Sequence, residues 1–95
     1  MQQIGKSAVT KRSVVIGGHK TSVSLEEPFW NEVRAIAEAE QITVSNLLRR
    51  IDRERSNANL SSAIRVYVLE HVREKVRRLR RESEHEAFEP QVVAL

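Results

Sequence analysis

Residues 19–30, HKTSVSLEEPFW, decide the fold together with residues 42–51, ITVSNLLRRI. From His19 to Leu25 polar and apolar side chains alternate, which is the two-residue period of a β-strand. One face of this strand carries Thr21, Val23 and Leu25, and the other carries Lys20, Ser22 and Ser24. Pro28 then ends the strand and suits the first turn of a helix, where its missing N–H costs nothing.

Two amphipathic helices are predicted next, because apolar residues recur three and four positions apart. The first covers about 28–40, and its apolar positions are Trp30, Val33, Ile36 and Ala37. The second covers about 43–55, with Thr43 as its N-cap. Its apolar positions are Val44, Leu47, Leu48 and Ile51, the i, i+3, i+4, i+7 series of a helix that buries one face.

The rest of the chain divides by composition. Residues 1–12 predict a flexible basic arm. Residues 57–81 predict an additional helix, capped by Asn59, and residues 82–95 an acidic tail. Gly17 and Gly18 leave two alternatives open, since they can close a hairpin onto the short β-branched run 14–16 or serve as a hinge. The central domain is therefore 13–56, mainly α-helical with one strand.

Composition excludes several classes of protein. The 95 residues suffice for one small domain, and the absence of cysteine excludes disulfides and thiolate sites. No apolar run is long enough to span a membrane, and the N-terminus lacks the pattern of a secretory signal. We therefore expect a cytoplasmic protein. No catalytic motif, cofactor motif or clustered set of metal ligands is visible, so we expect neither an enzyme nor a metal site.

The net charge of +3 hides a segregated pattern. Residues 1–25 carry four basic groups and no acid, residues 26–48 are acidic, and residues 56–81 hold seven basic groups against two acids. Residues 82–95 hold four glutamates and no base. Alternating blocks are typical of solvated helix faces, but two basic blocks around an acidic one also indicate a surface for a polyanion.

A single strand leaves its backbone donors and acceptors unpaired, which predicts a second copy of the chain as its partner. Two strands would pair antiparallel across a two-fold axis, and the helices of both chains would share one core. We expect this dimer core to contain Val23, Leu25, Trp30, Val33, Ile36, Leu47, Leu48 and Ile51.

The order strand, proline-started helix and Thr-capped helix resembles the ribbon-helix-helix superfamily of DNA-binding proteins, to which Arc and MetJ belong. More narrowly, RSVVIGGHKTSVSLEEPFW (12–30) and NLSSAIRVYVLEHVRE (59–74) are similar to a subgroup of small uncharacterised bacterial ribbon-helix-helix proteins. The resemblance covers about residues 12–75. It implies a homodimer that binds duplex DNA as a transcriptional regulator, with repression as the expected outcome.

The resemblance also implies which residues touch DNA. The outward strand positions, expected to contact bases, are Lys20, Ser22 and Ser24. The residues expected to contact phosphates are Thr43, Val44 and Ser45 at the start of the second helix, with Lys11, Arg12 and His19 beside the strand. The chemistry agrees, since a two-stranded ribbon fits the major groove, lysine donates to guanine, and a helix N-terminus attracts anions.

A different class of function stays open. The dimer could be a protein-interaction module, such as an antitoxin-like adaptor, in which residues 60–95 bind a partner protein. The basic end of the third helix would then meet an acidic partner, or it could contact DNA nonspecifically. Residues 59–81 could also join two dimers into a tetramer on adjacent half-sites.

Overall fold

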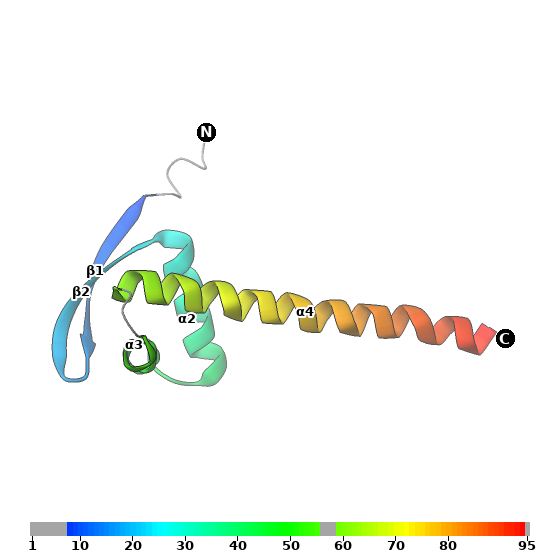
Figure 1. Ribbon diagram of the computed structural model, residues 1–95. Coiled ribbons are helices and arrows are strands. Elements are labelled where there is room, and N and C mark those ends of the chain that lie inside the picture. The colour runs from blue at the N-terminus through cyan, green and yellow to red at the C-terminus, as the bar shows by residue number, and fades with distance from the viewer. Residues whose placement is uncertain (1–7, 56–58, 95) are drawn as a thin grey trace.

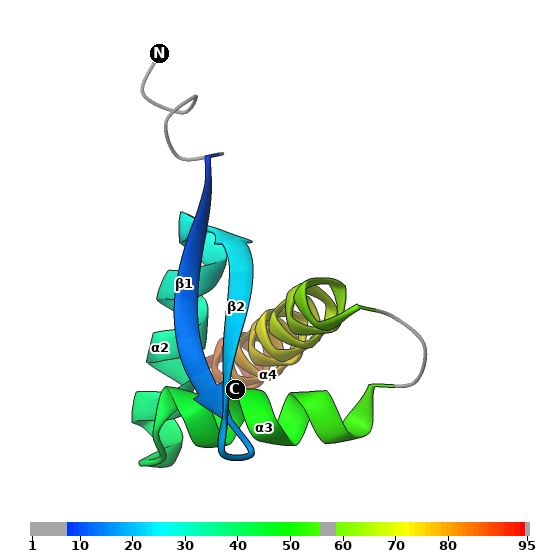
Figure 2. The ribbon, with the colours of Figure 1, turned by 90° about the vertical axis from the view of Figure 1, so that its left-hand side faces the viewer.

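The computed structural model describes residues 8–55 and 59–94. They form a β-hairpin followed by three helices (Figure 1). The elements are β1 (Val9–Ile16), β2 (His19–Glu26), α2 (Glu27–Glu40), α3 (Val44–Glu54) and α4 (Leu60–Ala94). The hairpin lies at one end of the molecule, α2 and α3 pack behind it, and α4 starts beside β2 and runs away from the hairpin (Figures 1 and 2).

The two glycines close a hairpin, which settles the alternative between a hairpin and a hinge. Gly17 and Gly18 have φ values of 59° and 84°, and two consecutive positive φ angles are what a two-residue turn of the right twist requires. The antiparallel register pairs Ile16 with His19 next to the turn and Val9 with Glu26 at the far end. The chain therefore has two strands where we expected one.

β1 is longer than the run 14–16 that the sequence indicated, and it includes Val9–Arg12, where we expected a flexible arm. Lys11 and Arg12 interrupt the apolar pattern, but a two-stranded ribbon needs only one apolar face. Once the turn fixes the register, these residues pair with β2 whatever their side chains, because the ladder is made by the backbone.

The first two helices begin and end within one residue of the predicted bounds. The Thr43 hydroxyl accepts a hydrogen bond from the backbone N–H of Asn46 at 3.0 Å, which confirms Thr43 as the N-cap of α3. α2 ends at Glu40, and its C-cap Gln41 has a φ of 59°, which lets the N–H of Ile42 reach the carbonyl of Ala37 at 3.0 Å. This left-handed residue reverses the chain and sends it into α3.

α4 begins as expected and continues much further. Asn59 caps it by accepting the N–H of Ser62 at 2.8 Å. The helix ends at Ala94, whereas we expected a helix to about 81 and a separate acidic tail. Loss of apolar spacing past residue 81 suggested an end, but glutamate and alanine, which recur through residues 82–94, favour the helix intrinsically.

The core closes within a single chain. All eight residues predicted for a shared dimer core are at most 3% exposed, and Ile16, Ala37, Ile64 and Val68 join them. β1 supplies the strand partner that we expected from a second chain, and the first turns of α4 cover the apolar face that remains. Pairing of β2 with β1 therefore removes the lone-strand argument for a dimer.

Candidate nucleic-acid interface

The outward face of the hairpin is mostly polar, and it also carries the exposed Val9 and Val15. Directly opposed residues of an antiparallel pair point to the same side, so the register assigns both strands together. Lys20 is opposite Val15, Ser22 opposite Ser13, and Ser24 opposite Lys11. Lys11, Ser13, Lys20 and Ser22 are exposed, whereas Ser24 is half-buried. Figure 2 views the ribbon from this side, with α2, α3 and α4 all behind it.

The inward face holds the hairpin to the body. Ile16, Val23 and Leu25 enter the core, and the Trp30 indole N–H donates to the carbonyl oxygen of Thr10 at 3.0 Å. Trp30 is 1% exposed, so this bond gives a partner to an N–H group that would otherwise be buried without one. The outward face is thus presented on a ribbon whose orientation is fixed by packing and by a hydrogen bond.

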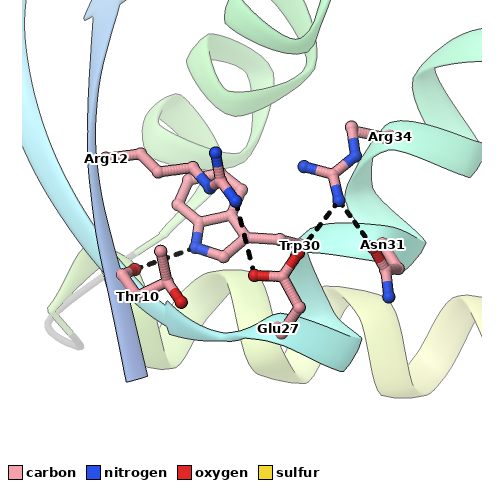
Figure 3. A network of polar contacts seen from close by, with 6 residues as sticks. All are labelled: Thr10, Arg12, Glu27, Trp30, Asn31 and Arg34. Carbon is pink, nitrogen blue, oxygen red and sulfur yellow. Dashed lines mark hydrogen bonds and ion pairs between the residues drawn. The ribbon is translucent and has the colours of Figure 1, made fainter. Parts of the chain in front are cut away.

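Arg12 belongs to the inward set, although we expected it to contact phosphate. Its guanidinium lies over the Trp30 ring, 5.6 Å from the centroid, and pairs with the Glu27 carboxylate at 3.4 Å. The same carboxylate receives Arg34 at 3.3 Å, and Arg34 also donates to Asn31 (Figure 3). Neighbouring residues of a strand point to opposite faces, so Arg12 does not share the face of Lys11 and Lys20. Arg12 instead reinforces the junction of β1 with α2.

The charge of Glu27 is set by two opposing effects. Partial desolvation disfavours its ionised form, but hydrogen bonds from Arg34 and Arg12 outweigh this, and the pKa of Glu27 lies below its ordinary value. The carboxylate therefore stays ionised at neutral pH between its two guanidinium partners.

The outer edge of β2 is partly covered by α4. The backbone groups of Ser24 point away from β1, and its carbonyl accepts the Ser61 hydroxyl at 2.9 Å. One turn further along α4, Arg65 Nε donates to Glu26 at 2.9 Å, and this contact lowers the pKa of the Glu26 carboxyl. These contacts bind α4 to the end of β2 and explain why Ser24 is less exposed than Ser22.

The start of α3 lies on the body behind the hairpin, and α3 contacts β1 (Figure 2). Thr43 is exposed, and Val44 and Ser45 are half-buried. Since Thr43 satisfies only the N–H of Asn46, the first amides of the helix form the positive end of its dipole. Of the two arginines that follow, Arg50 is engaged with Glu40 at 2.6 Å, and Arg49 is exposed.

His19 is exposed at the tip of the hairpin beside Gly18. Its carbonyl oxygen receives the Thr21 hydroxyl at 3.5 Å, a contact at the limit of hydrogen-bond distance. His19 is at the same end of the ribbon as Lys20, but it is opposite the core residue Ile16 and so points to the other face of the ribbon.

Metal binding and membrane insertion would each need features other than the ribbon. Residues 8–55 and 59–94 contain no group of three histidines, aspartates or glutamates placed to hold a metal ion. In the same ranges no helix is both long and apolar enough to cross a membrane.

Sequence reasoning missed that β1 contributes to the candidate surface. It treated Lys11 as part of an arm and did not single out Ser13. The signal was present, because a two-residue Gly-Gly turn fixes the register, and counting back from it places Ser13 opposite Ser22 and Lys11 opposite Ser24.

Comparison with known proteins agrees with this architecture. The search of curated proteins gave no match. Among solved structures, an uncharacterized protein from Bordetella pertussis Tohama I is similar, with a TM-score of 0.66 and 28% sequence identity. The match covers 78% of this chain and 63% of that one, so this chain spans less than two thirds of its neighbour.

The family comparison is more specific. A model described as the ribbon-helix-helix domain matches residues 9–72, which run from the first residue of β1 into α4. The first part of α4 is thus inside the family domain, although we expected the third helix to be an addition to it. Proteins of this family typically bind DNA and form dimers. The match spans well over half of the chain, and this protein belongs to the ribbon-helix-helix domain family.

Proposed function

We propose that this protein binds duplex DNA by inserting the outward face of its hairpin into the major groove. The observation that carries the proposal is that Lys11, Ser13, Lys20 and Ser22 project from one face of a two-stranded ribbon. Strands lie about 4.8 Å apart, so the ribbon with its side chains suits a groove about 12 Å wide.

The chemistry of these side chains suits base edges. Lysine donates to the O6 and N7 acceptors of guanine, and serine donates or accepts at several bases. Because Ser24 is half-covered by α4, Lys20 and Ser22 are the main readers on β2. On β1, Ser13 is opposite Ser22 and Lys11 is opposite Ser24. The amides of Val44 and Ser45 at the start of α3 are suited to a backbone phosphate, which would fix the register of the ribbon in the groove.

We infer further that the protein acts as a homodimer and as a transcriptional repressor. Members of the family typically dimerise, and a two-fold pair of ribbons would read two related half-sites. In this chain each ribbon is complete in one copy, so the dimer contributes a second reading element and greater affinity. The protein would act by occupying its site and without catalysis.

The test compares two lysines of the same chain. After selection of a preferred duplex from a random pool, we expect Lys20→Ala to weaken binding to that duplex by roughly 10- to 100-fold and to weaken binding to random duplex much less. Lys75→Ala, on the part of α4 that points away from the ribbon, is the matched control and should change both affinities little. Fluorescence anisotropy at two salt concentrations measures the losses.

Two results would contradict the proposal. One is equal loss on selected and random duplexes for Lys20→Ala, because base reading requires discrimination. The other is absence of any binding to duplex DNA at micromolar protein and low salt, where phosphate contacts are strongest.

A further inference from the structure

α4 carries an apolar stripe that the described chain leaves largely exposed, although Val72 also packs against the core. Its members recur three and four residues apart, and we call them the α4 seam: Val66, Leu69, Val72, Val76 and Leu79. Val66, Leu69, Val76 and Leu79 are 55, 53, 44 and 50% exposed. Leu69 to Leu79 follow the 3-4-3 spacing of a and d positions in a coiled coil, the pattern of a helix that packs against another helix.

The seam continues into a groove on the body. Phe29 of α2 and Val68 of α4 line an open, almost wholly apolar groove of about 330 Å³ together with Val66, Leu69 and Val72. Arg65 lies at its margin, where it is held by Glu26. A helix lying along the seam would therefore meet Phe29 at one end and Leu79 at the other.

The charges that flank Leu69 to Leu79 are mostly positive, and Glu82 is an acid at the g position after Leu79. In the heptad defined by Leu69 and Val76, Arg73 and Arg80 occupy e positions and Lys75 a g position, which flank the seam. Of the two acids between Leu69 and Leu79, Glu70 lies at position b, and Glu74 pairs with Arg77 at 2.7 Å and with Arg81 at 3.8 Å. Glu74 is at position f, on the side of the helix opposite the seam. The flanks of the seam are therefore predominantly basic, and Glu74 does not neutralise them.

We propose that the α4 seam binds an amphipathic helix of a partner protein that carries acidic residues beside its apolar stripe. Opposite charges at e and g positions select partners in helix pairs, and basic flanks select glutamate or aspartate. A second copy of the same seam fits less well. A parallel pair would set Lys75 of one copy against Arg80 of the other, and an antiparallel pair would bring like residues together.

DNA bound at the hairpin is also a poor occupant of the seam. α4 runs away from the outward face of the ribbon in both views, so its basic segment points away from a duplex held there (Figures 1 and 2). An apolar seam adds nothing to phosphate binding, whereas it supplies the buried area that a helix pair requires. This inference is independent of the proposed DNA contact.

The experiment uses the full chain and a synthetic helical peptide of about three heptads, with leucine at a and d and glutamate at e and g. A second peptide with lysine at e and g has the same length and apolar content. We expect the glutamate peptide to bind, with affinity falling at high salt, and the lysine peptide to bind at least about tenfold more weakly. Fluorescence anisotropy measures both affinities.

Matched variants locate the contact. Arg80→Glu, beside the seam, should weaken the glutamate peptide roughly tenfold, and Arg78→Glu, on the far side of the same turn, should weaken it much less. Leu69→Glu should abolish binding through the seam itself. All three positions are exposed, so the fold is retained, which circular dichroism checks.

Four results would overturn the proposal. Equal binding of both peptides would show that the basic flanks do not select the partner. Equal effects of Arg78→Glu and Arg80→Glu would show that the peptide does not bind on the face of the seam. Loss of a dimer on Leu69→Glu in sedimentation would identify the occupant as a second copy. A fall in duplex DNA affinity that is specific to Arg80→Glu would assign the surface to DNA.

Discussion

The two parts of α4 differ in what their apolar residues meet. In the first part, Ile64 and Val68 are 0 and 3% exposed and pack against β2, α2 and α3. In the second part, Val76 and Leu79 recur at similar spacing and are 44 and 50% exposed. The same periodicity therefore gives a core in one place and an open stripe in the other. Spacing identifies the face of a helix that needs a partner, and topology decides whether the chain provides it.

The largest expected effect of this contrast is on stability. Ile64→Ala should lower the free energy of unfolding by about 2–5 kcal/mol, because it opens a cavity in a site with no exposure. Leu79→Ala should change it by less than about 0.5 kcal/mol, because the side chain already meets water. Urea denaturation measures both. Similar losses at the two positions would show that the far part of α4 is covered in solution.

A smaller effect is expected where α4 meets the edge of β2. Ser61→Ala should cost about 0.5–1.5 kcal/mol, because it removes the hydroxyl that binds the carbonyl of Ser24. Ser62→Ala is the control on the next residue, since only its backbone N–H takes part in a described contact, the Asn59 cap. Thermal unfolding of both variants compares the two serines. A larger loss at Ser62 would contradict the role of this edge contact.

The two ion pairs of α4 should respond differently to pH. The pKa values of Glu26 and Glu74 are both lowered, chiefly by hydrogen bonds from Arg65 and Arg77 respectively. A carboxyl group whose pKa is lower in the folded state adds stability at pH values above its unfolded pKa, which is 4.5 here. This gain disappears as the pH falls through the folded pKa. Only the pair of Glu26 joins two elements, β2 and α4.

Arg65→Met should therefore lower the urea midpoint at pH 7, and the difference from the unmodified protein should shrink below pH 4.5. Arg77→Met should leave the midpoint unchanged at both pH values, because Glu74 and Arg77 lie three residues apart on one helix. Parallel behaviour of the two variants would mean that the far part of α4 unfolds together with the body.

The largest deletion should have only a small effect on stability. Ending the chain at Val72, where the family match ends, should change the melting temperature by only a few degrees, since no core residue is removed. Duplex DNA affinity should also persist. Binding of the glutamate peptide should be lost, because Val76, Leu79 and their basic flanks are gone. Loss of DNA binding in the shortened chain would place a reading element in the far part of α4.

The sequence predicted the helical part of the fold closely. Apolar spacing and caps located α2 and α3, and the Thr43 and Asn59 caps are both confirmed. It did not predict the extent of β1, because Lys11 and Arg12 break the apolar alternation and strand pairing depends on the backbone of a partner. The sequence also predicted too early an end for α4, because apolar spacing marks the buried face of a helix. The described side chains of the projecting part, residues 73–84, are exposed.

The candidate site was predicted in part. Alternation from the core residues Val23 and Leu25 correctly assigned Lys20 and Ser22 to the outward face. The half-burial of Ser24 depends on Ser61, which is 37 residues away in sequence, and no local pattern contains it. The inward position of Arg12 follows from a register that only the hairpin fixes.

A ribbon closed by Gly17 and Gly18 within one chain separates folding from assembly. When two chains must share strands, the monomer has no fold of its own, and its stability depends on protein concentration. Here the hairpin is local in sequence, and such turns form in microseconds without an encounter between chains. For the proposed homodimer we therefore expect that a single copy leaves, remains folded and joins another copy, so that subunits exchange without unfolding.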